Sequence, residues 1–266
     1  VKSTVRDIAY RNASLVYPTK SQKSDVIVFT EIPLADFAFH IDGKTKEYEA
    51  SISALAIVKD QSGQVVQKFS QLFPLRGPKD KAADTQGRNI LFYRTLELPP
   101  GRYSVESVVR DAISEKISVK RSVLIVPSRP EKSSALSTVA LIKRLVDARG
   151  STELATSPLH SQERMVIPNL QQEINSKKTP DLLLYFIAMI PSVGESKPTM
   201  DMIVSKDGQA LGRLGETALP APDEAGRVPY VAKLPLRSFS PGNYDVQVLI
   251  NLSGVTTSNS VSFVIQ

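Results

Sequence analysis

The sequence predicts an all-β protein made of two tandem β-sandwiches. Three observations lead to this fold class. Apolar residues alternate with polar ones along many segments, prolines and glycines fall mostly between those segments, and the two halves of the chain repeat one order of motifs. With 18 prolines and 13 glycines in 266 residues, the chain has enough turn-forming residues to separate many short strands.

The alternation has a period of two. It is clear in Tyr103–Arg110, in Tyr244–Asn251 and in Val261–Ile265. Successive side chains of a strand point to opposite faces of a sheet, so such segments are typical of half-buried strands. Helical patterns are scarce. Lys2–Leu15 is compatible with a short helix, and Ala135–Arg149 can be read as helix or strand, of which we favour a strand over Ser137–Leu145.

An internal repeat is the most informative feature. Asp60-Gln61-Ser62-Gly63-Gln64-Val65-Val66 in the first half corresponds to Lys206-Asp207-Gly208-Gln209-Ala210-Leu211 in the second. Both segments indicate a hairpin turn, at Gly63 and at Gly208, followed by a strand.

Downstream of each hairpin, the same turn motif introduces another strand. The motif is Pro100-Gly101-Arg102-Tyr103 in the first half and Pro241-Gly242-Asn243-Tyr244 in the second. Proline presets φ for a turn and glycine supplies a positive φ after it. A tyrosine that packs into the core and bonds nearby backbone resembles the tyrosine corner of immunoglobulin-like sandwiches. We therefore expect two tandem immunoglobulin/fibronectin-III-like sandwiches.

The polar, proline-containing segment Pro127–Ser134 indicates the boundary between the two modules. We expect an N-terminal arm or linker over residues 1–24, a first module over 25–128 and a second over 129–266. Within the arm, Ile8, Leu15 and Val16 are apolar and should dock on a folded surface. The chain starts at Val1, which suggests a processed chain or a part of a longer one.

These motifs carry a resemblance that extends from about Asp25 to the end of the chain. The sequence resembles the C-terminal β-sandwich region of bacterial VWFA-related proteins, in which such modules follow a von Willebrand factor type A domain. The residues that carry it are Leu98–Tyr103, Val109–Asp111, Val126-Pro127, Val166–Asn169, Gly226–Ala232 and Pro241–Tyr244.

The A domain itself is absent from this chain. Its metal motif is Asp-x-Ser-x-Ser, and Asp60-Gln61-Ser62-Gly63-Gln64 lacks the last serine, so no metal site is carried over. The resemblance implies a periplasmic, cell-surface or secreted location in bacteria.

Composition excludes several chemistries. The chain has no cysteine, which rules out disulfides, thiolate metal sites and cysteine nucleophiles. The two histidines, His40 and His160, are interpreted as ordinary surface residues. Asp80, Asp84 and Gln86 have the spacing of a calcium loop, but Lys79, Lys81 and Arg88 surround them, and a solvated hairpin loop is favoured, as it is for Pro222–Gly226.

No phosphate loop, dinucleotide fingerprint or nucleophile elbow is present, so the sequence predicts no enzyme and no cofactor. The net charge of +6 is dispersed, with +5 in residues 1–128 and +1 in the rest, and no span of about 20 apolar residues occurs. We therefore expect neither a nucleic-acid partner nor a transmembrane span.

The leading hypothesis is a non-catalytic protein–protein interaction or structural accessory module, which should present an apolar patch or an open sheet edge. The alternative is a carbohydrate-binding module. It would need coplanar, exposed tyrosines, because the chain has no tryptophan. With Tyr103 and Tyr244 assigned to the cores, the remaining candidates are Tyr10, Tyr17, Tyr48, Tyr93, Tyr185 and Tyr230.

Overall fold

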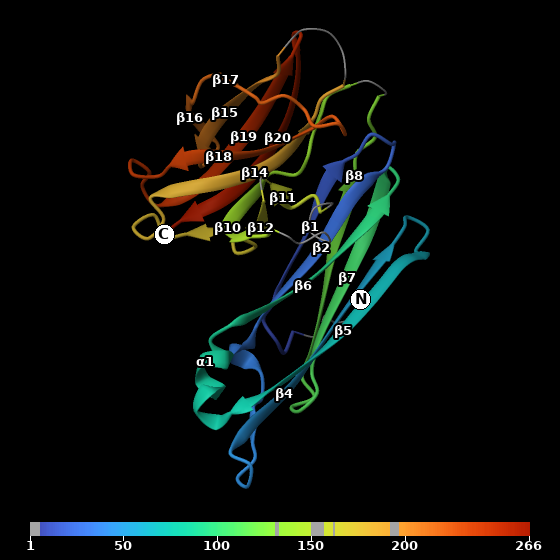
Figure 1. Cartoon of the computed structure of the whole chain (residues 1–266), viewed down its shortest axis with the longest axis vertical. Coiled ribbons are helices and arrows are strands. Elements are labelled where there is room, and N and C mark those ends of the chain that lie inside the picture. Colours follow the sequence, from blue (N-terminus) through green and yellow to red (C-terminus); the bar gives the residue numbers. More distant parts are fainter. Residues whose placement is uncertain (1–5, 131–132, 150–156, 162, 192–196) are drawn as a thin grey trace. The chain divides into compact units, whose positions relative to one another are not determined.

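A computed structural model describes residues 6–130, 133–149, 157–161, 163–191 and 197–266 (Figure 1). The chain forms two compact units. The first comprises Val1–Ser14, Ile27–Leu96 and Pro100–Pro127, and the second comprises Leu15–Val26, Glu97–Pro99 and Ser128–Gln266. Nearly all of the regular structure is β, which confirms the all-β class. No helix in the described part of the chain is long and apolar enough to cross a membrane.

Two sheets account for the first half of the chain. One has the order β1 (Arg11–Pro18), β2 (Ser24–Pro33), β6 (Asn89–Leu98). The other has the order β5 (Val65–Pro78), β4 (Glu47–Lys59), β7 (Gly101–Asp111), β8 (Ile117–Val126), with the short β3 (His40–Ile41) also on β4. The inner face of the second sheet is apolar: Ile52, Ala54, Ala56 and Val58 of β4 are at most 1% exposed.

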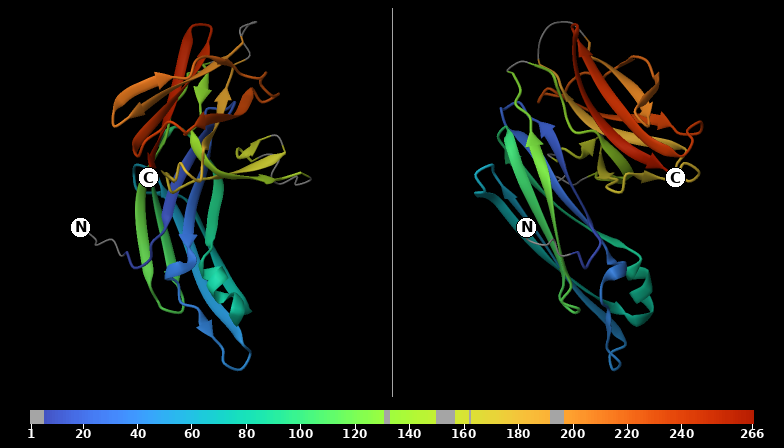
Figure 2. Two further views of the ribbon diagram at one scale, coloured as in Figure 1. Left: turned by 90° about the vertical axis from the view of Figure 1, so that its left-hand side faces the viewer. Right: turned by 180° about the vertical axis from the view of Figure 1, so that it is seen from behind.

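The second half repeats this pattern. β10 (Ala140–Asp147), β14 (Asp181–Met189) and β18 (Arg227–Pro235) form one sheet, extended by β9 (Ala135–Leu136), β11 (His160–Ser161) and β12 (Arg164–Pro168). The other contains β16 (Gln209–Arg213), β15 (Thr199–Lys206), β19 (Gly242–Leu252) and β20 (Val255–Ile265), with β13 (Glu173–Ile174) and β17 (Thr217–Ala218) at its margins. Figure 2 shows β19 and β20 as one long hairpin.

The two halves therefore share one topology. The order β1-β2-β6 corresponds to β10-β14-β18, and β5-β4-β7-β8 corresponds to β16-β15-β19-β20. In the second unit, side chains from both sheets form a continuous apolar core that includes Leu184, Phe186, Val246, Val248 and Ile250. Two sheets that bury their inner faces against each other form a β-sandwich.

Both repeated segments form hairpins. Between β4 and β5, Oδ1 of Asp60 accepts hydrogen bonds from the backbone N–H groups of Ser62 and Gln64 at 2.9 and 3.0 Å, and Gly63 has φ +86°. Between β15 and β16, Asp207 and Gly208 have φ +49° and +83°. Positive φ at both central residues is the pattern of a two-residue type I′ turn, for which Asp-Gly is a preferred sequence.

Local predictions for the first 24 residues and for Ala135–Arg149 have different outcomes. The helix expected at Lys2–Leu15 is wrong for residues 11–15, which belong to β1, while residues 2–5 lie outside the described part. The docking of Ile8, Leu15 and Val16 is confirmed, since each is at most 9% exposed. Within the second unit, Val16 and Thr138 exchange hydrogen bonds, and the preferred strand near Ser137–Leu145 is present as β9 and β10.

The loops at Asp80–Gln86 and Pro222–Gly226 are not hairpin loops, so that prediction is wrong. The first contains a 3-10 turn, Lys79–Lys81, and the short helix α1, Ala82–Gln86. It joins β5 to β6, and the second loop joins β17 to β18. In both cases the two strands lie in different sheets, so the chain has to cross the sandwich instead of turning back on itself.

Asp111 organises one end of the first unit. Its carboxylate is 0% exposed and accepts hydrogen bonds from the N–H groups of Ala38, Ile113 and Ser114 and from the Ser114 hydroxyl. Burial raises the pKa of this carboxyl, but the hydrogen bonds outweigh it and the pKa lies below its usual value. The carboxylate thus ties the β7–β8 turn to the backbone that follows Phe37.

We expect Asp111→Asn to lower the free energy of unfolding at neutral pH by about 2 kcal/mol, because an amide nitrogen would face backbone donors. A lowered folded-state pKa stabilises the protein above the unfolded-state pKa of about 4, and this contribution is lost as pH falls through the folded-state pKa. Urea unfolding from about pH 7 to about pH 3 should therefore show a shrinking difference between variant and wild type. A difference that does not change with pH would contradict this role.

Gly63→Ala and Gly208→Ala should each destabilise the protein by about 1 kcal/mol, because a Cβ disfavours positive φ. No heavy atom lies within 4 Å of the added Cβ at either position, so strain in the backbone is the expected cause. Gly43→Ala is the matched control, since it has equal space and no positive φ. Equal thermal unfolding midpoints for all three variants would be evidence against the turn geometry.

Candidate functional site

The most distinctive surface of the described chain is the free edge of β5. Over its 14 residues this strand pairs with β4 and with no other strand among the described residues. At about 3.3 Å per residue, the edge is about 45 Å long. Figure 1 shows β4 and β5 running side by side along the first unit, with α1 at the end of β5. Strands of this length at a sheet edge present a row of backbone groups to solvent.

Apolar side chains accompany this edge on both faces. On the inner face, the rings of Phe69 and Phe73 contact the buried Phe92 of β6, with centroid distances of 5.9 and 6.2 Å. On the outer face, Leu72 is 59% exposed. Val65 and Val66, at the start of the strand, are 49% and 36% exposed. The edge therefore combines unpaired backbone with apolar surface, a combination typical of interaction sites.

Apolar residues also occupy the outer face of the same sheet. The register places Leu55 of β4 beside Val108 of β7, and Val108 beside Val119 of β8. All three side chains are half-buried and lie on the face opposite to the buried Ala54 and Val109. Val123 and Ile125 of β8 are more than half exposed. This edge strand was not predicted from the sequence. Proline at positions 74 and 78 is the signal that could have indicated it, because proline is excluded from central strands.

The predicted turn residues lie at the starts of β7 and β19. Pro100 and Pro241 precede the two strands, and Tyr103 and Tyr244 are 7% and 1% exposed. The positive φ expected after proline is present at Gly242 (+151°) but not at Gly101, where that prediction is wrong. Both strands begin at the glycine, so the position in the strand does not explain the difference. A Cβ at Gly101 would lie 3.4 Å from the Tyr103 ring.

Tyr244 forms a tyrosine corner. Its hydroxyl donates a hydrogen bond to the carbonyl of Ser240 at 2.7 Å, and its ring stacks on Phe263 and meets Phe239 edge to face. The ring thus fills the core of the second unit, while the hydroxyl fixes the turn that precedes β19. These residues stabilise the fold.

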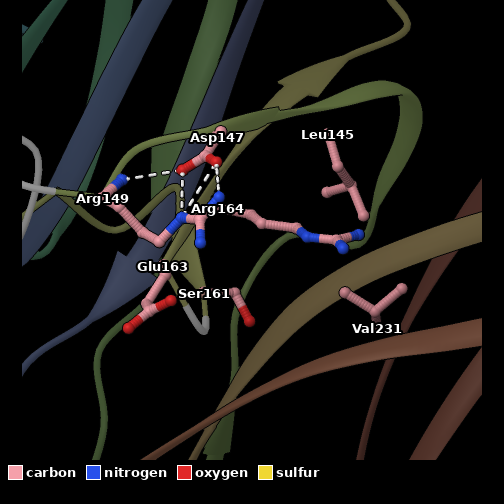
Figure 3. Close-up of a pocket in the computed structure, with 7 residues that line it drawn as sticks. All are labelled: Leu145, Asp147, Arg149, Ser161, Glu163, Arg164 and Val231. Atoms are coloured by element: carbon pink, nitrogen blue, oxygen red, sulfur yellow. Dashed lines mark hydrogen bonds and ion pairs between the residues drawn. The ribbon is translucent and has the colours of Figure 1, made fainter.

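A polar hollow of about 490 Å³ in the second unit is lined by Leu145, Asp147, Arg149, Ser161, Glu163, Arg164 and Val231 (Figure 3). Asp147 and Arg149 face each other, and the Arg149 Nε lies 3.1 and 3.0 Å from the two carboxylate oxygens. The Arg164 side chain extends away from this pair, toward Leu145 and Val231.

Two carboxylates in one hollow would favour an enzyme if one of them could donate a proton. Hydrogen bonds from the side chain and backbone of Arg149 lower the pKa of Asp147. A general acid at neutral pH needs the opposite shift. Asp147 therefore serves as the acceptor of an exposed ion pair, and the hollow offers a binding surface without a proton donor at this position.

The other candidate groups are dispersed. His40 is exposed at the start of β3, and His160 is half-buried in β11. Among the described residues, no group of three His, Asp or Glu side chains could hold a metal ion. Asp80 and Asp84 lie in the crossover beside Lys79 and Lys81, as the sequence indicated.

The tyrosines form no exposed platform. Tyr10, Tyr17, Tyr48 and Tyr185 are at most 6% exposed. Tyr93 stacks on Phe29 and Tyr230 packs against Phe186, and both are half-buried. The arrangement that would have favoured a carbohydrate-binding module is therefore not found on these six side chains.

Tyr244→Phe should lower the free energy of unfolding by about 1 kcal/mol, because it removes one hydrogen bond and leaves the ring packing intact. Tyr230→Phe is the matched control: its ring packs on Phe186, and its hydroxyl has no hydrogen bond to a described residue. Urea denaturation of both variants tests the difference. If both lose the same amount of stability, the hydroxyl of Tyr244 does not fix the turn.

Comparisons with known proteins reveal no family. No family model matches the chain, and no curated protein matches it. Among solved structures, it aligns with a β-glucuronidase from Bacteroides uniformis at 11% identity and a TM-score of 0.30, over 48% of this chain and 13% of the enzyme. It also aligns with B. uniformis β-glucuronidase 2, covalently bound to cyclophellitol-6-carboxylate aziridine, at 12% identity and a TM-score of 0.28, over 46% and 13%. The aligned part is thus a small fraction of each enzyme, and similarity at this level supports no inference about function.

Proposed function

We propose that this chain is a non-catalytic protein–protein interaction or structural module of a bacterial envelope or secreted assembly. The observation that carries the proposal is the free, apolar edge of β5. The assignment to the bacterial envelope rests on the resemblance to VWFA-related proteins. No motif for catalysis, cofactors or nucleic acid occurs in the sequence, which is why an interaction role is preferred.

Strand addition is the mode of binding that this edge supports. A partner strand that pairs with β5 satisfies its outward-facing backbone groups, and main-chain hydrogen bonds then supply affinity. The partner's side chains would cover Leu72 and Val66, which are exposed at different positions along β5. The backbone groups and the apolar side chains that would contact the partner are exposed to solvent in the free protein. Binding therefore requires no rearrangement of the sandwich.

The N-terminal and C-terminal parts of β5 differ in how well they can accept a partner strand. Pro74 and Pro78 lack an N–H group, and Arg76 pairs with Glu47 and Glu49, so the C-terminal part is poorly suited to accept a strand. Residues 65–73 contain no proline and one charged side chain, Lys68. We therefore assign strand addition to residues 65–73.

The first test is the mass of the native assembly, taken from gently extracted source material with its co-purifying chains identified. A complex larger than 29.1 kDa is expected, and in the complex with the purified partner the amides of residues 65–73 should exchange hydrogen more slowly. A protein that runs alone at its own mass, or unchanged exchange along β5, would overturn the proposal.

The matched variants are Leu72→Lys and Val255→Lys, which place the same charge at residues 59% and 61% exposed. Leu72→Lys should weaken binding of the identified partner at least tenfold, because an ammonium is costly to bury beside an added strand. Val255→Lys, in the second unit, should bind as wild type does. Both should keep wild-type stability within about 0.5 kcal/mol. Equal binding by both would exclude the β5 edge.

A further inference from the structure

The segment that leads into β1 crosses the free edge of β8. Arg6 forms a β-bridge with Ser118, and the N–H of Ile8 donates to the Ser118 hydroxyl at 2.6 Å. Ile8 and Tyr10 are each 2% exposed, so this segment is anchored by two buried side chains. Between it and β8 lies a hollow of about 530 Å³, which falls within the size range of small-ligand sites.

Five polar residues line this hollow, and we name them the basic groove: Arg6, Asn12, Ser118, Lys120 and Arg121. Three of them are cations, and none of the described residues that line the hollow is a carboxylate. The remaining lining is apolar, from Ile8 and Ala9. Residues separated by more than 100 positions in the sequence are thus brought together, so charges that are dispersed along the chain gather at one surface.

The neighbouring carboxylates leave this positive charge largely uncompensated. The Oδ2 atom of Asp7 accepts a hydrogen bond from the N–H of Ile117 at 3.4 Å. Glu106 pairs with Arg121 at 2.8 Å, but it also pairs with Lys59 at 3.1 Å. Arg6 has no ion pair among the described residues.

Lys120 is held in place by its surroundings. Its ammonium donates to the carbonyl of Tyr10 and lies 4.9 Å from the centre of the Tyr10 ring. Burial lowers the pKa of Lys120, and the charges of Arg6 and Arg11 lower it further. The ammonium is therefore fixed at the wall of the hollow among like charges, an arrangement that a bound anion would stabilise.

We propose that the basic groove binds an oxyanion, specifically a phosphoryl or sulfuryl group. Arginine and lysine donors match the geometry and charge of such groups, and Asn12 and Ser118 add neutral polar groups at the same wall. The group comes either from a soluble phosphate compound or from a phospholipid headgroup. This site is separate from the β5 edge, so the two proposals stand or fall independently.

Inorganic phosphate is the probe for the first arm, titrated into ¹⁵N-labelled protein at constant ionic strength set with chloride. The expected result is a saturable change in the amide signals of Ile8, Asn12, Ser118 and Arg121. Arg6→Gln should raise the dissociation constant about tenfold, because it removes one charge-assisted contact. Arg6 is exposed and forms no ion pair with the part of the chain that the structure describes, so the variant should fold normally.

Lys44→Gln is the matched control, since it makes the same charge change at an exposed position in the turn before β4. It should bind phosphate as wild type does. Arg121→Gln provides a second groove variant and should also weaken binding. Shifts that grow linearly with phosphate, or equal losses in Arg6→Gln and Lys44→Gln, would overturn the proposal.

The second arm identifies the source of the group. Vesicles of phosphatidylcholine with and without phosphatidic acid are sedimented with wild type and Arg6→Gln. Binding that requires phosphatidic acid, is competed by inorganic phosphate and is weakened in the variant assigns the groove to a lipid headgroup. Saturable phosphate binding without vesicle binding assigns it to a soluble phosphate compound.

Discussion

An apolar layer between two facing sheets holds each unit together. In the second unit this layer is continuous from β14 to β19, and in the first the inner face of β4 is almost completely shielded from water. Because burial of apolar surface is the main stabilising contribution in such domains, each strand has to direct one row of side chains inward. The period-two pattern, the crossovers between sheets and the position of the tyrosine corner all follow from this requirement.

The same architecture determines where binding surfaces arise. A sandwich that is open at its sides leaves edge strands. In the larger sheet of the first unit these are β5 and β8, and they differ in how they are covered. The β8 edge is partly covered by the segment around Arg6 and Ile8, which creates a hollow with a basic wall. The β5 edge has no such cover among the described residues and relies on Pro74, Pro78 and Lys68 for protection.

Local sequence was sufficient for several strands and for the hairpins at Gly63 and Gly208. Alternation identified β7, β19 and β20, and the Asp-Gly signal identified the turn at Gly208. Local sequence was insufficient wherever a segment's structure depended on pairing with residues far away in the sequence. Pro78–Gln86 has the composition of a loop, but nothing local indicates that the next strand, β6, pairs with β2 in the other sheet.

Local sequence predicts the candidate binding sites even less well than the fold. The fold brings Arg6 beside Lys120 and Arg121, and no spacing rule connects residues so far apart. The helix expected at Lys2–Leu15 failed for a related reason, because pairing with β2 decides the conformation of β1. Gly101 illustrates a third case: the same turn motif precedes β7 and β19, but of the two glycines only Gly242 has a positive φ.

The duplicated topology has a consequence for folding. Neighbouring copies of one strand order can exchange equivalent strands during synthesis, and this error is characteristic of repeat proteins. In this protein the two copies differ in the loops and turns that connect equivalent strands. In the second, a long insertion with β11, β12 and β13 separates the first strand from β14, whereas a short turn joins β1 to β2. The hairpin after Asp111 is fixed by a buried carboxylate. At the equivalent turn Ser253 and Gly254 have φ +51° and +79°, and the Thr256 hydroxyl donates to the side chain of Asn251. A strand of one copy is therefore joined by connections that differ in length and conformation from those of its counterpart. This difference disfavours exchange and favours pairing within each copy.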